Sequence, residues 1–518
     1  MATQNAKLID TIVKRLLDHI DTHYTQSDIS LFKQFTQLYY QHAPTPDIQQ
    51  RSTAQLFGLV RNHWSLFRQA STDHENMPFT IYNPSQHQHG WESTHTVLQL
   101  VVDDMPFIVD SIRMEIDRLK LPNFLMIFTG GIWVQRNAEQ KVTGLSSRYS
   151  FDPSTASEGW KIESPIHTEI GRQTDPAKLF KLESNIMRVM SDVREVTRDW
   201  EAMCTQVQSS IQSLQEPLPC VETEEVEESI AYLRWLLDDH FTFLGMRDYT
   251  VEEHNGDKVL KLVVGSGLGV LKDDSSSRKT RFFHELAAEV QKMMLSNKHV
   301  LVISKTNTLS TVHRVGYTDY VGIKQFDQQG NLLGERRFIG LYTSAAYNSA
   351  PRSIPLLRRK VMRVLKESGF PSRSHSGKDL MHILRTLPRD DLFQSSVNEL
   401  LDLSLGILHM QERRQVRLFV RKDVYGRFTS SIVFIPRERF SSDLIKKVER
   451  ILVQGFNGTE CSFTTNFSSP VLTQIHFLIR VDNNICSYDV ESLESQIIAA
   501  SANWDDELKA SIMQFFGE

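Results

Sequence analysis

Three closely spaced glycines form the first stretch in which a ligand could be bound. Gly265, Gly267 and Gly269 follow the strand-like run Lys261–Val264. A dinucleotide-binding loop has the spacing G-x-G-x-x-G after a strand, and it opens a helix whose N-terminus faces the pyrophosphate. That spacing requires glycine at position 270, where this chain has Val270. The next residues show no helical periodicity, so the sequence predicts a glycine-rich turn between strands.

The second stretch is a junction between an expected strand and an expected helix. The strand-like run Thr94–Val102 leads into Asp103-Asp104-Met105-Pro106-Phe107. Asp104 is a suitable N-cap and Pro106 a suitable early helical residue. Free backbone N–H groups at a helix start can bind an anion such as the carboxylate of an amino acid. The candidate ligand-binding residues are therefore Asp104, Met105, Pro106 and Phe107, with plain structural packing as the alternative.

Other catalytic patterns are missing from the sequence, which contains no GxSxG, HExxH or Walker A motif. Asp103, Asp104 and Asp110 are more simply explained as helix caps and dipole partners than as a catalytic carboxylate pair. Three lysines are expected on strand or helix surfaces, where they could not polarise a buried carbonyl group: Lys305, Lys324 and Lys360. The sequence predicts no catalytic residue and no cofactor-binding residue in this chain.

Four histidines lie in or beside the polar stretch 71–93: His74, His87, His89 and His95. Their spacing is loose, and no carboxylate is fixed on the same helical face. A solvated loop explains them better than a metal site, so no metal ligand is predicted.

Composition sets wider limits. The chain has 518 residues, 40% hydrophobic and 23% charged, with a formal net charge of -5. This is typical of a soluble globular protein of roughly three or four domains, and it favours neither a nucleic-acid partner nor a membrane. The four cysteines are far apart, which predicts free thiols in a reducing compartment: Cys204, Cys220, Cys461 and Cys486. We expect a cytoplasmic protein.

The segment 312–347 gives the clearest prediction of secondary structure. Apolar and polar residues alternate on both sides of Asp327–Asn331, as in two long strands joined by a turn. Gly330 and Asn331 both tolerate the positive φ that such a turn needs.

The order of elements predicts a multidomain α+β protein. Residues 94–213 read as β-α-β-β(-β)-α, the order of ferredoxin-like βαββαβ units, which include ACT domains. Residues 416–518 repeat this order, with a last helix over 490–516. The middle sheet is compatible with an ACT-like or a PAS-like unit. The predicted parts are a helical segment and linker (1–93), a first ACT-like domain (94–215), a second α+β domain (222–350), a helical segment (351–412) and a further ACT-like domain (413–518).

Five collinear stretches resemble the large bacterial NAD-specific glutamate dehydrogenases. They are VDDMPFIVDSI (102–112), LLDDHFTFLGMRDY (236–249), VHRVGYTDYVGIKQFD with GERRFIGLYTSAAY (312–347), LRTLPRDDLFQ (384–394) and VRLFVRKDVYGRFTSSIVFIPRERF (416–440). The resemblance implies a noncatalytic N-terminal region of ACT-like domains and helical motifs, with the catalytic and NAD-binding domains further toward the C-terminus.

The resemblance also implies a role and partners. The parent enzyme would convert glutamate, NAD and water to 2-oxoglutarate, ammonia and NADH, so NAD would be its cofactor outside this region. The chain would regulate or assemble it, as a homo-oligomer in contact with the C-terminal catalytic domain and with an amino acid as effector. A stand-alone sensor or scaffold is the alternative. ACT loops that bind ligands commonly carry D-x-P-G, whereas Phe107 stands here at the glycine position.

Overall fold

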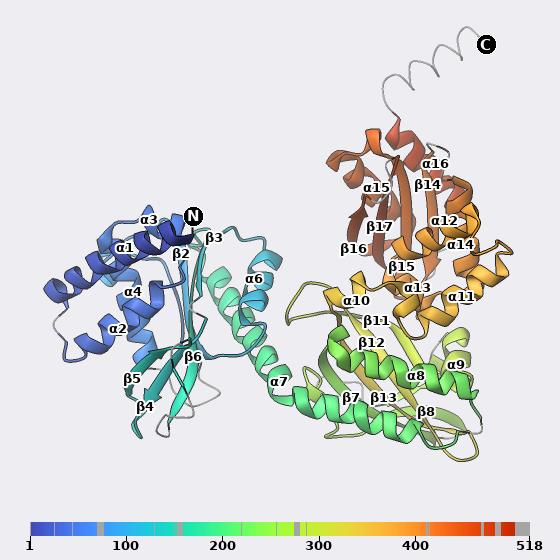
Figure 1. The fold of residues 1–518 in the computed structure, drawn as a ribbon, viewed down its shortest axis with the longest axis horizontal. Coiled ribbons are helices and arrows are strands. Elements are labelled where there is room, and N and C mark those ends of the chain that lie inside the picture. Colours follow the sequence, from blue (N-terminus) through green and yellow to red (C-terminus); the bar gives the residue numbers. More distant parts are fainter. Residues whose placement is uncertain are drawn as a thin grey trace, which may run out of the picture. The chain divides into compact units, whose positions relative to one another are not determined.

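The chain folds into two compact units (Figure 1). Unit 1 comprises Met1–Thr197 together with Ser310–Val315, and unit 2 comprises Arg198–Leu309 and Gly316–Glu518. The computed structural model describes residues 2–24, 26–43, 45–69, 77–128, 130–149, 151–152, 159–218, 220–254, 256–273, 280–285, 287–410, 413, 415–467, 471–481 and 488–502.

Unit 1 is built around a six-stranded antiparallel sheet. Its strands are β1 (Phe79–Tyr82), β2 (Thr96–Asp103), β3 (Asn123–Phe128), β4 (Ile132–Arg136), β5 (Val142–Ser147) and β6 (Trp160–Ile170). The order is β1-β2-β6-β4-β5, and β3 also pairs with β6. β3 lies along one part of β6 and β4 along the other. Gly130 and Gly131 lie between β3 and β4, at φ 73° and 85°.

Helices cover both faces of this sheet (Figure 1). α1 (Ala2–His23), α2 (Ile29–Tyr40), α3 (Thr45–Gln49) and α4 (Thr53–Arg68) lie on one face, and α6 (Ile108–Arg118) and the first half of α7 (Pro176–Leu214) on the other. The short α5 (Gln86–His89) lies in the connection between β1 and β2. Val97 and Val101 of β2 pack with the α1–α4 layer. Because successive strand residues alternate, this β2 face also carries Gln99.

Unit 2 begins with a seven-stranded sheet, in the order β10-β8-β7-β13-β12-β11 with β9 paired to β7. The strands are β7 (Phe241–His254), β8 (Asp257–Leu262), β9 (Leu268–Gly269), β10 (Thr280–Phe282), β11 (Leu301–Leu309), β12 (Tyr317–Phe326) and β13 (Leu332–Tyr342). The accompanying helices are α8 (Thr223–Trp235), a π-helical turn (Leu236–His240), α9 (Ala288–Leu295) and α10 (Ser344–Asn348). The predicted hairpin is confirmed as β12–β13, and Gly330 takes the left-handed conformation at φ 83°.

The rest of unit 2 is a helical segment followed by a four-stranded sheet. The helices are α11 (Leu357–Glu367), α12 (His375–Thr386), α13 (Arg389–Gln394) and α14 (Val397–Met410). The sheet contains β14 (Arg417–Lys422), β15 (Phe428–Pro436), β16 (Gly458–Asn466) and β17 (Leu472–Val481) in the order β14-β15-β17-β16. α15 (Ser442–Gly455) and α16 (Val490–Ser501) pack on one face through an apolar core. The part of the predicted last helix beyond residue 502 lies outside the described residues.

Several predictions about single residues can be compared with this fold. Cys204, Cys220 and Cys461 are free thiols as expected, and Cys486 lies outside the described residues. None of the described helices combines the length and hydrophobicity needed to cross a lipid bilayer. The mixed α+β, multidomain fold class is confirmed.

Candidate functional site

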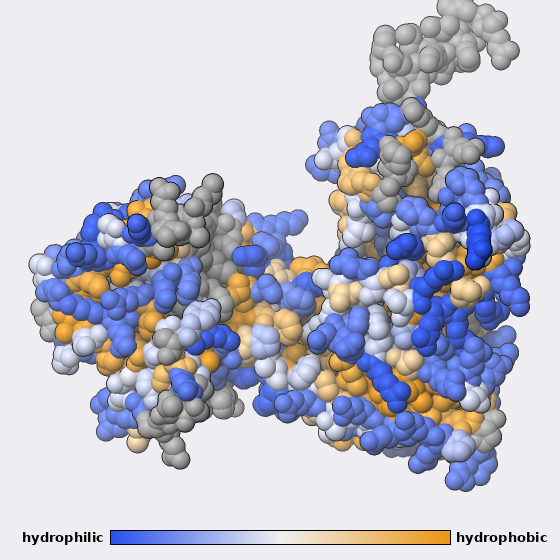
Figure 2. Space-filling view, viewed as in Figure 1, coloured by the Kyte–Doolittle hydropathy of each residue, from blue (hydrophilic) through white to orange (hydrophobic). Residues whose placement is uncertain are grey.

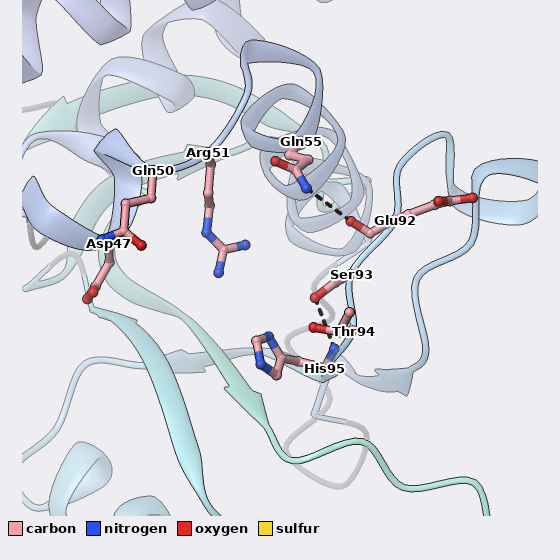
Figure 3. Close-up of a pocket in the computed structure, with 8 residues that line it drawn as sticks. All are labelled: Asp47, Gln50, Arg51, Gln55, Glu92, Ser93, Thr94 and His95. Carbon is pink, nitrogen blue, oxygen red and sulfur yellow. Dashed lines mark hydrogen bonds between the residues drawn. The ribbon is translucent and has the colours of Figure 1, made fainter.

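A polar cavity of about 600 Å³ opens beside α3, α4 and the segment before β2 in unit 1. Figure 3 shows the eight residues that line it: Asp47, Gln50, Arg51, Gln55, Glu92, Ser93, Thr94 and His95. A volume of this size is typical of small-molecule sites. The cavity is therefore the first candidate for a functional site.

Local structure fixes two of its walls. Ser52 caps α4, because its hydroxyl accepts from the amide of Gln55 at 3.2 Å while the Gln55 side chain accepts from the amide of Ser52 at 3.0 Å. This reciprocal capping box orients both residues at the start of the helix. The Gln55 amide group also donates to the backbone carbonyl of Glu92 at 3.5 Å, which ties α4 to the opposite wall. Arg51 comes immediately before the capping residue and points into the cavity (Figure 3).

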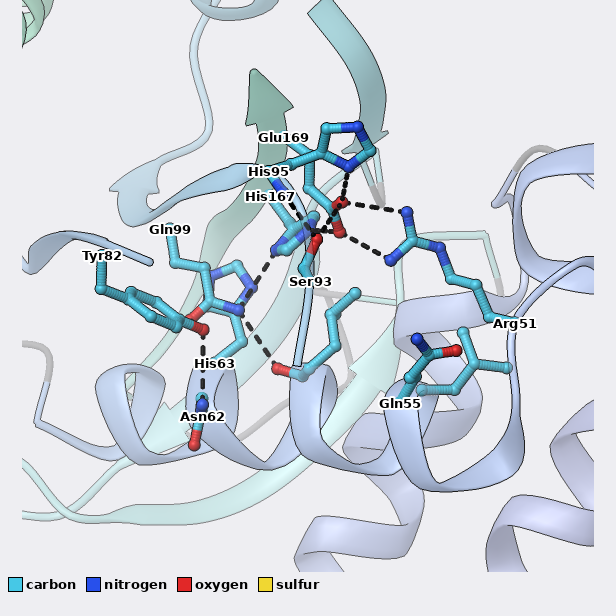
Figure 4. Close-up of polar contacts among 12 residues, drawn as sticks. Arg51, Gln55, Asn62, His63, Tyr82, Ser93, His95, Gln99, His167 and Glu169 are labelled. Carbon is cyan, nitrogen blue, oxygen red and sulfur yellow. Dashed lines mark hydrogen bonds and ion pairs between the residues drawn. The ribbon is translucent and has the colours of Figure 1, made fainter. Parts of the chain in front are cut away.

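A buried carboxylate lies behind the cavity (Figure 4). Glu169 of β6 is fully buried and accepts two hydrogen bonds from the Arg51 guanidinium, at 2.7 and 3.0 Å. It also lies 3.2 Å from His95 Nδ1 and 3.2 Å from His167 Nε2, and it accepts from the Ser93 hydroxyl at 3.4 Å. One carboxylate therefore fixes side chains from the helical layer, from the segment before β2 and from β6.

These contacts keep Glu169 charged. Burial alone would raise the pKa of Glu169, but the hydrogen bonds from His167 and Arg51 and the positive charge of Arg51 outweigh it and lower that pKa to about 2. The two-pronged contact with Arg51 is the geometry in which a guanidinium binds a carboxylate most strongly. A carboxylate so fully engaged holds its neighbours in place and is not available as a general base.

The protons of the network behind Glu169 can be assigned one by one. Because Glu169 is an acceptor, His167 must donate from Nε2, and its Nδ1 accepts from the Gln99 amide at 3.2 Å. Gln99 donates a second time, to the carbonyl of Leu59 at 3.1 Å. His63 donates from Nε2 to the carbonyl of Leu100 at 3.2 Å, so its Nδ1 accepts from the Tyr39 hydroxyl at 2.8 Å.

Both buried histidines are neutral in this scheme, and their pKa values agree. Burial is the main cause that lowers the pKa of His63 to about 3. Burial also lowers the pKa of His167 in spite of the nearby Glu169. The layer between α4 and the sheet thus holds two hydrogen-bonded chains of neutral groups. The one through Gln99 and His167 ends on the charged pair of Glu169 and Arg51 at the cavity wall. Such an arrangement is suited to binding and orienting a polar molecule.

The predicted turn at residues 104–107 has a different geometry from the one expected. Asp104 does not cap the helix, because its carboxylate accepts from Arg148 at 2.6 Å and from the Ser164 hydroxyl at 2.7 Å. α6 begins at Ile108, so Pro106 lies in the turn before it. The N-cap is Phe107, in the left-handed conformation at φ 71°, and its ring lies 4.9 Å from that of His313.

The glycine-rich segment is confirmed as a turn between strands. Gly265 and Gly269 take left-handed conformations at φ 79° and 59°. A side chain at Gly269 would come within 2.2 Å of the carbonyl oxygen of Leu244, so the turn requires glycine there. The amide of Gly269 donates to the carboxylate of Asp199 at 3.0 Å, and this negative charge opposes a phosphate at the same place.

The prediction of three surface lysines is wrong. Lys305 is 8% exposed and Lys324 is 2% exposed. The ammonium group of Lys305 lies 2.6 Å from Asp319 and 3.1 Å from Asp390. Lys324 donates to the carbonyls of Met293 and Ser296 at 2.7 and 2.8 Å.

Lys360 also turns inward from its helix. It donates to the carbonyls of Leu392, Phe393 and Ser395, at 2.9, 2.8 and 2.8 Å. Burial lowers the pKa values of Lys324 and Lys360 to about 8. All three amines are used by protein groups, which gives them a role in packing.

Sequence reasoning missed the cavity itself. The stretch 71–93 was predicted as a solvated loop, but Trp91 within it is 2% exposed, and His95 beside it contacts Glu169. The signal that could have drawn attention to the site is the alternation His167-x-Glu169, which places two polar residues on one face of a strand. In the described part of the chain, no three His, Cys, Asp or Glu side chains converge as a metal site would require.

Comparison with known proteins connects these domains to one family. The models for the glutamate dehydrogenase ACT1 domain, helical motif 1 and ACT2 domain match residues 35–186, 354–413 and 417–505. The NAD-specific glutamate dehydrogenase of Halomonas elongata is 34% identical over 520 residues, covering 100% of this chain and 32% of that protein. The corresponding enzyme of Pseudomonas aeruginosa is 33% identical over 487 residues, covering 93% of this chain and 29% of that protein.

A more distant relative shows the same relationship. The NAD-specific glutamate dehydrogenase of Mycobacterium tuberculosis is 25% identical over 388 residues, covering 74% of this chain and 22% of that protein. The chain therefore spans about a third of the length of the two more similar relatives. It belongs to the NAD-specific glutamate dehydrogenase family, in which it corresponds to the N-terminal region with the ACT1 domain, helical motif 1 and ACT2 domain.

Proposed function

We propose that this chain is the noncatalytic regulatory and assembly region of a cytoplasmic NAD-specific glutamate dehydrogenase. The parent reaction would convert L-glutamate, NAD and water to 2-oxoglutarate, ammonia and NADH. NAD would bind to a C-terminal catalytic part of the same enzyme, and the whole would form a homo-oligomer. The match to the ACT1, helical motif 1 and ACT2 models within relatives three times as long carries this proposal.

The chemistry of the described residues agrees with a role in binding and assembly. The polar groups that could serve catalysis are engaged in the fold: Glu169 with Arg51, Lys305 with Asp319 and Asp390. Buried, paired charges of this kind hold elements together and fix their geometry. Domains organised in this way suit the positioning and control of chemistry elsewhere in the polypeptide.

An amino-acid effector at Asp104, Met105, Pro106 and Phe107 remains part of the proposal. Among the described residues, no acceptor bonds the amide groups of Met105 and Phe107, so a carboxylate could be received there. The Phe107 ring, which lies against the ring of His313, narrows the access of a ligand to these amide groups. An alternative function is assembly alone, without an effector.

Two measurements test the proposed function. We expect the purified 518-residue chain to form no NADH from glutamate and NAD, and the genomic sequence downstream to encode dehydrogenase domains in the same frame. Turnover by the chain itself would overturn the proposal. Calorimetry with each of the twenty amino acids separates the regulatory role from the assembly role. If none of them gives binding heat, assembly is the only role that remains.

A further inference from the structure

The cavity beside α4 has features of a binding site that lies apart from the 104–107 turn. Its charged wall is prearranged, because Glu169 holds the Arg51 guanidinium by two hydrogen bonds. A guanidinium has five N–H donors, so three remain after these two bonds. The Arg51 side chain is 18% exposed, and Figure 3 shows it directed into the open space. A ligand carboxylate would meet these donors without a conformational change in the arginine.

Neutral donors and acceptors surround the arginine. The Gln55 side chain is held by its capping contact and by the carbonyl of Glu92. The Ser93 hydroxyl accepts from the amide of His95 at 3.1 Å. These side chains have fixed positions, which gives the cavity the few oriented polar groups that a specific small-molecule site contains.

The balance of charge opposes a simple anion. Arg51 is already neutralised by Glu169, while Asp47 and Glu92 add two carboxylates to the cavity walls. Within the described residues, neither of these carboxylates is in an ion pair. Figure 3 shows Asp47 and Glu92 on opposite sides of Arg51, with the Glu92 carboxylate directed away from it. Asp47 is therefore the better partner for a positive group that lies beside Arg51.

We propose that the cavity lined by Asp47, Arg51, Gln55, Ser93 and His95 binds a small zwitterion that carries a primary ammonium group and a carboxylate. The carboxylate is bound by Arg51 and Gln55, and the ammonium group by Asp47. Free α-amino acids belong to this chemical class. The inference stands apart from the regulatory role proposed above, because binding can be measured in this chain without any enzymatic activity.

The test is calorimetry on the whole 518-residue chain with the twenty amino acids. For the amino acid that binds most tightly, the two half molecules are then titrated: the acid that lacks the ammonium group and the amine that lacks the carboxylate. We expect the zwitterion to bind at least about tenfold more tightly than either half, since each lost charged contact removes a charge-assisted hydrogen bond. Equal binding of a half molecule, or no heat with any amino acid, would overturn the proposal.

Three variants locate the binding. Asp47→Asn removes one charge and should weaken binding by about tenfold or more. Glu139→Gln is the matched control, because Glu139 is an exposed carboxylate of the same unit that pairs with Lys141, and it should leave binding unchanged. Asp104→Asn tests the other candidate. Binding that survives Asp47→Asn and is lost in Asp104→Asn would place the ligand at the turn and overturn the proposal.

Hydrogen–deuterium exchange gives a second readout that does not depend on a variant. Bound ligand should slow exchange in peptides that cover residues 47–55 and 92–95. Protection confined to peptides around residue 107 would contradict the cavity. Binding in the cavity that leaves glutamate oxidation by the full-length enzyme unchanged would refute the regulatory role and leave this site standing.

Discussion

The six-stranded sheet of unit 1 and the four-stranded sheet of unit 2 share one strand order. β1-β2-β6-β4 in the first corresponds to β14-β15-β17-β16 in the second, with the β3/β4 pair in place of β16. A helix follows the second strand in each, α6 or α15, and another follows the strand beside it, α7 or α16. This is the ferredoxin-like arrangement with the last strand placed first. The predicted repeat of one unit type is thus visible in the topology.

The two sheets differ in the connection between their first two strands. β14 and β15 are joined by residues 423–427, a turn in which the Asp423 carboxylate accepts from the amides of Tyr425 and Arg427. β1 and β2 are joined by residues 83–95, which include α5, the buried Trp91 and four residues of the cavity wall. The long connection 83–95 of unit 1 therefore forms part of the cavity wall, whereas the corresponding connection in unit 2 is only the short turn 423–427.

The two sheets also differ in which layer holds the acidic and the basic partner of a buried ion pair. In unit 1 the carboxylate belongs to the sheet, as Glu169 of β6, and the guanidinium to the helical layer, as Arg51. In the second sheet the guanidinium belongs to the sheet, as Arg421 of β14, and the carboxylate to the helical segment, as Asp391 of α13. The first arrangement places an arginine at a cavity. One topology can thus carry the positive charge of such a pair either in the helical layer or in the sheet.

The largest effect is expected from removing the carboxylate of each pair. Glu169→Ala should cost unit 1 about 3–5 kcal/mol of unfolding free energy, because it leaves a partly buried Arg51 and a buried His167 without their acceptor. Asp391→Ala should cost the second sheet a similar amount through Arg421 and Ser430. Urea unfolding followed by hydrogen exchange in each unit measures both. A cost below about 1 kcal/mol in either would show that the charged pair does not hold its layers together.

Acid should destabilise unit 1 through its buried histidines. His63 has a pKa of about 3 in the folded chain, below its ordinary 6.5. Burial also lowers the pKa of His167. The unfolded chain therefore binds more protons below pH 6.5, and stability should fall by about 2–3 kcal/mol between pH 6.5 and 5. His63→Gln keeps a donor and an acceptor but cannot titrate, so it should remove about half of this slope. An unchanged slope would exclude His63 as its source.

Two glycines test the difference between the connections. A side chain at Gly58 of α4 would lie 2.5 Å from the ring of Trp91, so Gly58→Ala should cost about 1–3 kcal/mol by overpacking. Gly426, in the short turn, has φ +66° and open space around it, so Gly426→Ala should cost about 1 kcal/mol of backbone strain alone. Thermal unfolding compares the two. A larger cost at Gly426 would mean that the long connection adapts more easily than its packing suggests.

The smallest effect is expected on the stability of unit 2 at alkaline pH. Burial lowers the pKa of Lys324 to about 8, below its ordinary 10.5. Above pH 8 the unfolded chain binds more protons at this group, so Lys324 alone should add about 1 kcal/mol to the stability of unit 2 between pH 8 and 9. Lys324→Met cannot titrate and should lose that gain. Equal pH dependence of the variant and the original chain would assign the effect to other groups.

The sequence predicted the elements better than it predicted the surroundings of single side chains. The β12–β13 hairpin, the long α7 and the helices of the 351–412 segment follow directly from periodicity and turn residues. Lys324 was misplaced because Tyr317–Lys324 is buried on both faces of its sheet, so alternation along the strand does not report exposure.

The candidate site was hidden for a different reason. Arg51 and Glu169 lie 118 positions apart in the chain, and no local pattern connects them. Asp104 was predicted as a helix cap from its position before Pro106. Its actual partners, Arg148 and Ser164, come from residues far along the sequence. Periodicity therefore gave the scaffold, whereas the polar contacts depend on which strands become neighbours.

The segment Ser310–Val315 belongs to unit 1, although the strands before and after it, β11 and β12, belong to unit 2. The polypeptide thus crosses the unit boundary after Thr197, again after Leu309, and once more after Val315. A gene fragment ending near residue 197 would lack His313 and leave the aromatic face of Phe107 uncovered. Anyone dissecting this protein by truncation or limited proteolysis must sever the chain at three places, or graft the six-residue piece back, to obtain unit 1 intact.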